Sequence, residues 1–283
     1  MPEEDRYCHL ISTFDFEAIQ AKRCEKLRGR DILYKHIPAT FSIHSNIPGH
    51  TELQYRQSTG NPQKLVDEFV SILHLHQESV SQMMHRKFDT VFHDLNKDMQ
   101  ELTEKLESIS DKKDKISDTA KLKKLETLKA SLEKYCSQHT VLSFNGSRYD
   151  LPLIKRYLPS SLNLFEDLPT QIITKDRGYF LLATKRLKFL DVTNFLAAGT
   201  SLSSFYKAYK VETQKQSFPY SWFDSLEKLD APFLPALEEF YSVLTNSVIT
   251  EEEYQVALET WDLNGWEKFG QYVEYHNTID FWE

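Results

Sequence analysis

Hydrophobic and polar positions follow two different periods along the chain, and its N-terminal part has the period of β-strands. Apolar and polar side chains alternate around residues 11–18, and a second run of this kind covers residues 39–45. The turn residues Ile47, Pro48 and Gly49 follow the second run. We therefore expect two paired strands, closed by this turn.

The spacing of apolar positions becomes helical after Asn61 and Pro62, which are typical of a helix start. The apolar positions that follow are Leu65, Phe69, Ile72 and Leu73. Residues 97–134 are rich in Lys, Glu and Asp, with leucines on both sides of a polar break at residues 110–114. This stretch predicts two antiparallel helices that form a solvated hairpin; the alternative is an arm that docks a partner or guides DNA.

Strand-like segments return after the helical stretch and again alternate with helices. Strands are expected at residues 140–144, 179–183 and 187–192, and helices at residues 151–157, 204–210 and through the C-terminal section, where Thr250 to Glu253 resembles a capping box. The pattern predicts an α/β architecture. Residues 1–60 and 137–283 are expected to form one domain, and residues 61–136 a helical insertion.

The overall charge limits the ways in which this chain could bind nucleic acid. Lys and Arg total 34 against 42 for Asp and Glu, which gives a net charge of −8. A chain of this kind does not hold duplex DNA by charge alone, so a nucleic acid would have to be gripped locally by metal ions, aromatic rings and a few basic groups.

Several features favour an intracellular protein, without resolving a nuclear from a cytoplasmic location. No apolar run approaches the roughly 20 residues that span a bilayer, and the first five residues are acidic where a signal peptide would be basic and then apolar. Cys8, Cys24 and Cys136 lie far apart and form no C-x-x-C pair, so they are interpreted as reduced thiols. No membrane partner is expected.

Two carboxylates, Asp15 and Glu17, stand two residues apart in the first expected strand. Side chains alternate between the faces of a strand, so both point to the same side. Two like charges held this close repel each other unless a cation lies between them, and a divalent metal meets that need. The pair is the first candidate site.

Further acidic residues occur at two distant places. Asp150 opens a helix after a buried strand and a Gly turn, where by itself it could be an ordinary N-cap. Near the end of the chain, His276 and Asp280 are four residues apart on one helix face, and Tyr275 lies one step around. Four carboxylates with an imidazole or phenol beside the last match the needs of two-metal phosphodiester cleavage.

The order of these motifs resembles a known family, the 3′–5′ exonuclease domain of family B DNA polymerases. The likeness is to the protein-primed kind carried by Maverick/Polinton transposons and by related viruses, phages and organellar plasmids. Residues 14–17 are similar to the first exonuclease motif (DxE) and residues 144–150 to the second. Residues 201–205 resemble the (S/T)Lx2h motif and residues 215–218 the Kx2h motif.

The resemblance implies an RNase H-like fold with a mixed sheet, and proofreading of single-stranded DNA 3′ ends during DNA replication. Two Mg²⁺ or Mn²⁺ ions would be held by Asp15, Glu17, Asp150 and Asp280. Lys215 would assist catalysis. The residues that would contact DNA are Asn145, Tyr149, Ser201, Leu202 and Phe205.

The sequence departs from the family pattern at the third motif and at the end of the chain. The family has a tyrosine four residues before the last aspartate, where this chain has His276, with Tyr275 five before it. A helix keeps the residue at minus four on the face of Asp280, so His276 is expected to orient the water. Polymerase palm motifs are absent from the sequence, so a truncated chain without the polymerase domain is expected, with that domain and a terminal protein as implied partners. The alternative is an inactive remnant that binds single-stranded DNA or a terminal protein.

Other polar residues allow a structural and a functional interpretation. Asp191, at the end of an expected strand, could be a fifth acid but is expected to support the site through hydrogen bonds. His74, His76, His85 and His93 have spacings that do not stack two imidazoles on one helical turn, so they are not expected to bind metal. The basic residues Lys175, Arg177, Lys185, Arg186 and Lys188 could follow phosphates or serve only solubility.

Overall fold

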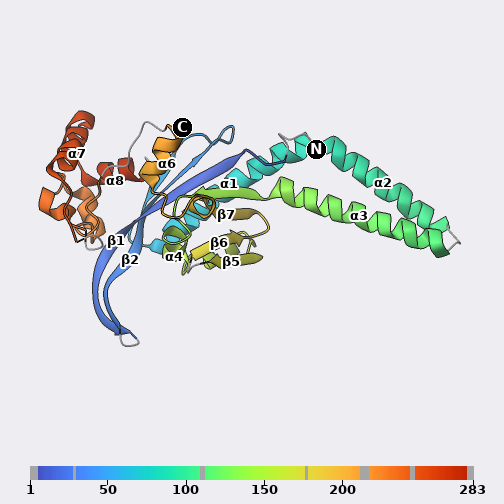
Figure 1. Ribbon diagram of the computed structural model, residues 1–283, viewed down its shortest axis with the longest axis horizontal. Coiled ribbons are helices and arrows are strands. Elements are labelled where there is room, and N and C mark those ends of the chain that lie inside the picture. The colour runs from blue at the N-terminus through green and yellow to red at the C-terminus, as the bar shows by residue number, and fades with distance from the viewer. Residues whose placement is uncertain are drawn as a thin grey trace.

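In the part of the chain that the structure describes, seven strands form one mixed sheet with helices packed on it (Figure 1). This computed structural model describes residues 6–27, 30–108, 112–175, 178–210, 217–242 and 246–278. The strands are β1 (Ile11–Leu27), β2 (Arg30–Ser45), β3 (Gln54–Gln57), β4 (His139–Ser143), β5 (Gln171–Lys175), β6 (Gly178–Ala183) and β7 (Leu187–Asp191). The helices are α1 (Pro62–Lys87), α2 (Asp89–Ser108), α3 (Lys112–Ser137), α4 (Asp150–Ile154), α5 (Leu158–Asn163), α6 (Leu202–Tyr209), α7 (Glu251–Asn264) and α8 (Phe269–Thr278). The predicted α/β class and the mixed sheet are confirmed.

The strand order is β3-β2-β1-β4-β7-β6-β5. β2 is antiparallel to both β1 and β3, and β4 and β7 run parallel to β1. β6 is antiparallel to β7, and β5 is antiparallel to β6. The predicted pairing of residues 39–45 with the first strand is confirmed. The turn at Ile47 follows β2 and leads to β3, so it does not close the β1–β2 hairpin, whose strands are far longer than expected.

The core beneath β1 explains which face of this strand carries the acids. Phe14 and Phe16 are buried against Phe69 of α1, with ring centroids 5.2 and 4.9 Å away, and Phe41 of β2 joins them. Because side chains alternate along the strand, burial of the even-numbered residues turns Asp15 and Glu17 to the other face.

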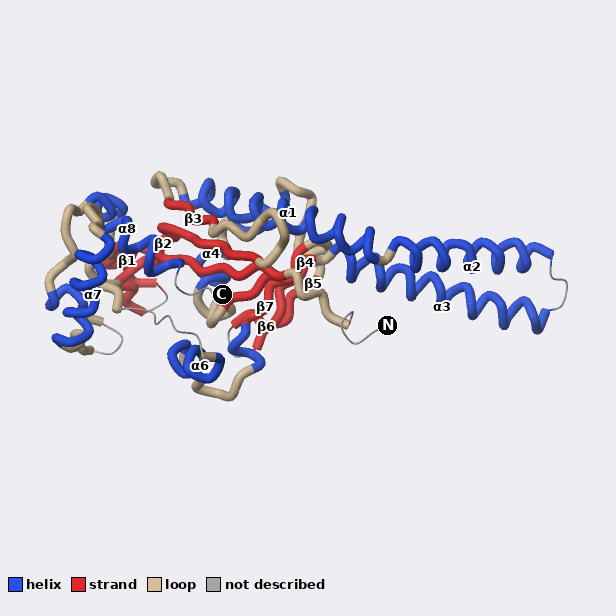
Figure 2. Tube along the Cα trace, turned by 90° about the horizontal axis from the view of Figure 1, so that it is seen from above, coloured by secondary structure: helices blue, strands red, loops and turns tan. Residues whose placement is uncertain are grey.

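The helical region has two parts, one packed on the sheet and one projecting from it. α1 begins as predicted at Asn61, whose Oδ1 accepts hydrogen bonds from the backbone of Gln63 and Lys64 at 3.0 and 3.3 Å. α1 packs on the sheet, whereas α2 and α3 project from it as the hairpin expected from the sequence (Figure 2). Within the predicted insertion of residues 61–136, the projecting part starts with α2 at Asp89.

The C-terminal section forms a second core on the far part of β1 and β2. Phe218, Phe223, Phe269 and Tyr272 cluster there with Ile19 of β1. α7 begins with the predicted capping box, in which Thr250 Oγ1 accepts from Glu253 N and Glu253 Oε2 accepts from Thr250 N. α8 then packs on β1 and β2, which brings the end of the described chain to the strand that carries Asp15 and Glu17. Among the helices of the described ranges, none is both long and apolar enough to cross a membrane.

Candidate active site

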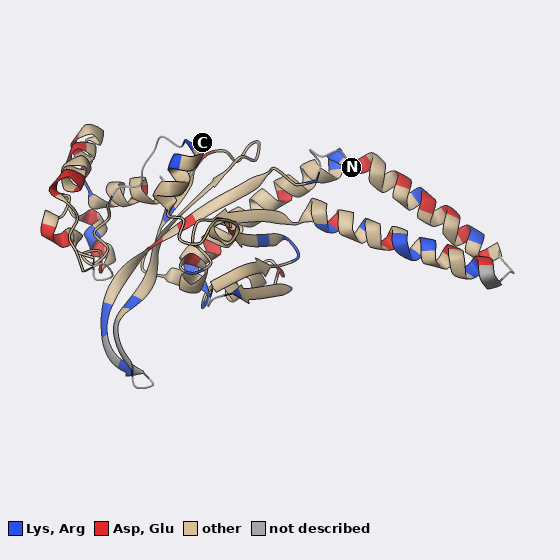
Figure 3. Cartoon of the chain, in the orientation of Figure 1, with Lys and Arg blue, Asp and Glu red and all other residues tan. Residues whose placement is uncertain are grey.

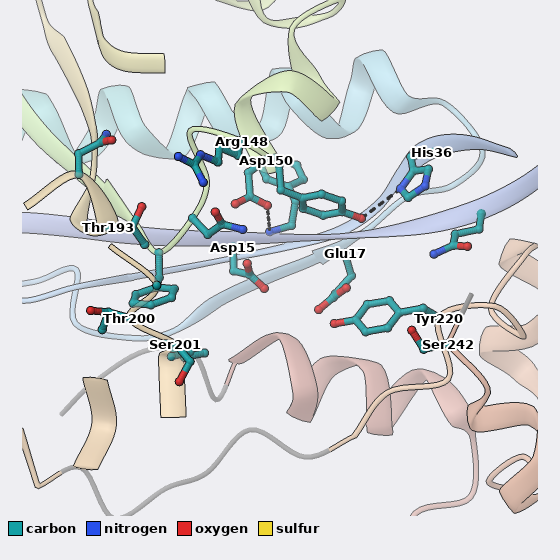
Figure 4. Close-up of a pocket in the computed structure, with 18 of the residues that line it drawn as sticks. Asp15, Glu17, His36, Arg148, Asp150, Thr193, Thr200, Ser201, Tyr220 and Ser242 are labelled. Carbon is teal, nitrogen blue, oxygen red and sulfur yellow. Dashed lines mark hydrogen bonds between the residues drawn. The ribbon is translucent and has the colours of Figure 1, made fainter. Parts of the chain in front are cut away.

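A cleft of about 810 Å³ opens over the odd-numbered face of β1 (Figure 4). Asp15 and Glu17 form its floor, and Asp150 enters from the start of α4. The structure thus brings together three of the four predicted acids. Asp280, the fourth, and Lys215 lie outside the described residues.

Asp150 is fixed directly to the backbone of the strand that carries the other acids. The N–H of Phe16 donates to Asp150 Oδ1 at 3.2 Å, and Asp150 is 2 % exposed. Gly146 permits this approach, because a Cβ at residue 146 would stand 2.8 Å from Asp150 Oδ2 and would also collide with Ser143. The tight turn after β4 therefore needs a glycine at this position.

Asp191 holds the same turn from the neighbouring strand β7. Its carboxylate accepts hydrogen bonds from the backbone N–H of Asn145 and Ser147, both at 3.0 Å, and from Thr193 N and Oγ1 at 2.9 and 2.7 Å. Asn145 has φ 62°, in the left-handed region where Asn is one of the more tolerant residues. The expectation that Asp191 supports the site through hydrogen bonds is confirmed.

α8 reaches Asp15 through Asn277, a residue that the sequence analysis did not single out. Asn277 Nδ2 donates to Asp15 Oδ2 at 2.9 Å, and Asn277 Oδ1 accepts from Thr40 Oγ1 at 3.1 Å. Ser42 Oγ also donates to the Asn277 carbonyl at 2.6 Å. The buried amide therefore orients Asp15 and joins α8 to β1 and β2.

His276 and Tyr275 occupy different surroundings. His276 is buried, and its Nε2 is 3.5 Å from Glu17 Oε1, with the Phe218 ring 4.5 Å from its own. Tyr275 instead packs on Trp266, at 5.1 Å between ring centroids, and burial raises the pKa of its phenol. The structure therefore brings His276 to the acids and turns Tyr275 away from them.

Tyr220 supplies an aromatic hydroxyl that the motif search did not predict. Its phenol lies beside Glu17 in Figure 4 and lines the cleft, and its ring is 6.3 Å from that of His276. No local sequence signal distinguishes it, because Tyr220 reaches the cleft from a loop more than 200 residues from Glu17.

The predicted DNA-contacting residues divide into two groups. Asn145, Tyr149, Ser201 and Leu202 line the cleft, and Ser201 is also the N-cap of α6. Phe205 is buried and packs on Phe144 at 5.7 Å, so it supports the wall of the cleft from behind.

Three acids on one cleft suit a hard divalent cation, because Mg²⁺ and Mn²⁺ prefer carboxylate oxygens. Within the described part of the chain, however, no group of three or more His, Cys, Asp or Glu side chains is gathered closely enough to hold a metal ion. Asp280 is outside that part. The metal cofactor therefore stays a prediction.

The remaining polar candidates lie away from the cleft. His74 Nε2 is 3.2 Å from Asp167 Oδ2, and His76 Nδ1 is 2.8 Å from Ser12 Oγ, so both are used in buried hydrogen-bonded networks. Lys188, in β7, is half-buried, and this burial lowers the pKa of its ammonium group. Among the basic residues that the structure describes, Lys175, Lys185, Arg186 and Lys188 do not line the cleft.

Comparisons with protein-family models, curated proteins and solved structures found no match to this chain. The assignment of a function therefore depends on the motifs in the sequence and on the geometry of the cleft.

Proposed function

We propose that this chain is the 3′–5′ exonuclease domain of a protein-primed family B DNA polymerase, with an RNase H-like fold. The observation that carries the proposal is the convergence of Asp15, Glu17 and Asp150 on one cleft, beside Asn145 and Tyr149. These residues come from two motifs about 130 positions apart in the sequence. The order of the motifs supports the family, and the mixed sheet with acids on its interior strand β1 supports the fold.

The acids Asp15, Glu17 and Asp150 would hold Mg²⁺ or Mn²⁺, and Asp280 would complete the set. Bound ions would supply an activated water and stabilise the leaving oxygen. The chain itself positions the participants. Asn145 and Tyr149 hold the 3′-terminal nucleotide, and Asn277 fixes the carboxylate of Asp15.

His276 acts on the reaction through Glu17. Its Nε2 lies 3.5 Å from Glu17 Oε1 and its ring does not line the cleft, so it would act by holding the orientation of this carboxylate. The phenol of Tyr220 is placed on the cleft side of Glu17, where it can orient water or a phosphate oxygen.

The test is hydrolysis of a 5′-labelled single-stranded DNA in Mg²⁺ or Mn²⁺. We expect a ladder of products shortened from the 3′ end, and no products from Asp15→Ala combined with Glu17→Ala. The matched control is Glu101→Ala with Glu104→Ala, which removes two exposed acids from α2. The absence of products with either metal at high enzyme concentration would contradict the proposal. Competition by an RNA oligonucleotide measures whether the site prefers deoxyribose or ribose.

A second function, binding of single-stranded DNA without cleavage, is favoured by the packing around the acids. Glu17 is 2 % exposed beside His276, and the Asn277 amide donates a hydrogen bond to one of the two carboxylate oxygens of Asp15. Calorimetry with Mn²⁺ separates the two functions. No Mn²⁺ uptake with retained binding of single-stranded DNA would support the binding module, whereas uptake that Asp15→Ala abolishes would support the nuclease.

A further inference from the structure

β1 and β2 continue beyond the sheet as a two-stranded ribbon, which we define as residues 20–27 and 30–36. β4 pairs with β1 only over Ile11 to Thr13, and the pairing from Gln20–His36 to Leu27–Arg30 joins β1 to β2 alone. Figure 1 shows this ribbon curving away from the rest of the molecule. An isolated two-stranded hairpin is marginally stable in water, so a ribbon of this length gains from a partner.

The ribbon is basic in an acidic protein. Residues 18–38 contain six Lys and Arg and two Asp and Glu, whereas the whole chain has a net charge of −8. Lys22, Arg23 and Lys26 are exposed, and Figure 3 shows basic residues along the described part of the ribbon. The local charge therefore attracts an anionic partner.

One face of the ribbon is continuous with the cleft. Directly paired residues share a face, so Gln20, His36, Lys22 and Tyr34 lie on the same side. Gln20, Tyr34 and His36 line the cleft, and Lys22 continues this face outward.

An aromatic row connects this face to the acids. Tyr149, next to Asp150, lies with its hydroxyl 3.4 Å from His36 Nδ1, and the two rings are 6.0 Å apart in an edge-to-face arrangement. His36 is followed outward by Tyr34. Aromatic rings interleaved with basic groups are the combination that binds single strands, because unpaired bases stack and phosphates meet the cations.

We propose that this face of the ribbon binds the single-stranded nucleic acid that leads into the cleft, with Tyr34 and His36 stacking on bases and Lys22 contacting phosphates. The choice of nucleic acid rests on the proposed function. The ribbon gives the protein a footprint longer than the cleft, so affinity increases with the length of the strand.

The experiment measures the binding of fluorescent oligonucleotides to the full chain in EDTA, where no hydrolysis interferes. An oligonucleotide of about 5 nucleotides occupies only the cleft, and one of about 20 also reaches the ribbon. We expect Lys22→Ala to weaken binding of the long strand roughly threefold at physiological salt and to reduce the slope of log K against log salt by about 0.7. Lys26→Ala, on the opposite face of the ribbon, should change this binding less. Binding of the short strand stays unchanged.

Two matched variants make the result specific. Lys123→Ala with Lys124→Ala removes two exposed lysines from α3 and leaves the binding of both strands unchanged. Tyr34→Ala weakens binding of the long strand, and Tyr34→Phe retains it. Circular dichroism confirms that each variant is folded.

Equal losses for the short and long strands, equal losses in the α3 variant, or tighter binding of a duplex than of the single strand would overturn the proposal. Failure of the proposed function is recognised separately. Length-dependent binding that requires Lys22, together with no hydrolysis in Mg²⁺ or Mn²⁺, would leave the ribbon site in place and remove the nuclease.

Discussion

Gly146 lies in the turn after β4, close against the carboxylate of Asp150. A Cβ at residue 146 would stand 2.8 Å from Asp150 Oδ2, while the other oxygen, Oδ1, accepts the hydrogen bond from the β1 backbone. The sequence showed a Gly turn before a helix, but it did not show that this turn presses on a carboxylate. A single absent methyl group therefore sets the position of the third acid.

We expect Gly146→Ala to displace Asp150 and to lower the exonuclease rate about 100-fold, because small misplacements of catalytic groups are costly. The free energy of unfolding should fall by about 1 to 3 kcal/mol, since the added methyl overpacks the turn. Rates on single-stranded DNA and urea unfolding measure the two effects. A variant with the wild-type rate would show that Asp150 is not needed where the structure places it.

His276 is a positioning residue for Glu17, and its replacements should separate orientation from packing. His276→Phe keeps a ring against Phe218 but removes the contact with Glu17, so we expect kcat to fall roughly tenfold or more at unchanged KM. His276→Gln keeps a polar group near Glu17 and should restore part of the rate. If His276→Gln restores no more of the rate than His276→Phe does, His276 acts through packing alone.

The α2–α3 hairpin is the element that is least connected to the cleft. Lys105 Nζ is 2.7 Å from Asp118 Oδ2, so the two helices run side by side. A short turn could therefore connect them at a point closer to the sheet. None of the cleft residues that the structure describes comes from this hairpin. Its base is anchored in a small core with Met84, Phe88 and Cys136.

Replacement of residues 97–126 by a short turn should therefore leave the exonuclease rate and the binding of single-stranded DNA within about twofold of the wild-type values, as for surface changes away from a site. Rate measurements on the shortened chain check this expectation. A large loss of DNA binding would instead assign the hairpin the DNA-guiding role that the sequence left open.

At the scale of the whole molecule, a buried histidine network makes the fold sensitive to acid. Ser12 Oγ is 2.8 Å from both His76 Nδ1 and His139 Nε2, at the point where β1, α1 and β4 meet. Burial lowers the pKa of His76 to about 4 and that of His139 to about 3. His50 packs on His76, with ring centroids 4.9 Å apart, and a positive charge on His50 also lowers the pKa of His76.

The sign of the pH dependence follows from these lowered values. Below the ordinary histidine pKa of about 6.5 the unfolded chain takes up protons that the folded chain does not, so stability is present above that pH and is lost as the pH falls toward 4. Each histidine should contribute a loss that approaches about 1.4 kcal/mol per pH unit.

Thermal unfolding between neutral pH and pH 5 measures this loss. His139→Gln can keep a hydrogen bond to Ser12 and should make the melting temperature less dependent on pH over this range. The same pH dependence in the variant and the wild type would show that the network is not the cause.

Local signals were sufficient to predict many helices and strands, and also the strand face that carries Asp15 and Glu17. The N-cap at Asn61, the capping box at Thr250 and the alternation around Asp15 all act over a few residues, so they can be read directly from the sequence. β3, β5 and α5 were not predicted. β5 is an exposed edge strand, without the buried alternation that identifies a strand, and α5 is only six residues long.

The sequence by itself determined that Asp15 and Glu17 share a face, that Asp150 opens a helix, and that Asp191 ends a strand. Only the tertiary structure decided that Asn277 bonds to Asp15, that Tyr220 lies beside Glu17, and that His36 meets Tyr149. These contacts join residues more than 100 positions apart. They depend on strand order, on register and on the packing of α8, which many distant side chains set together and which no local pattern specifies.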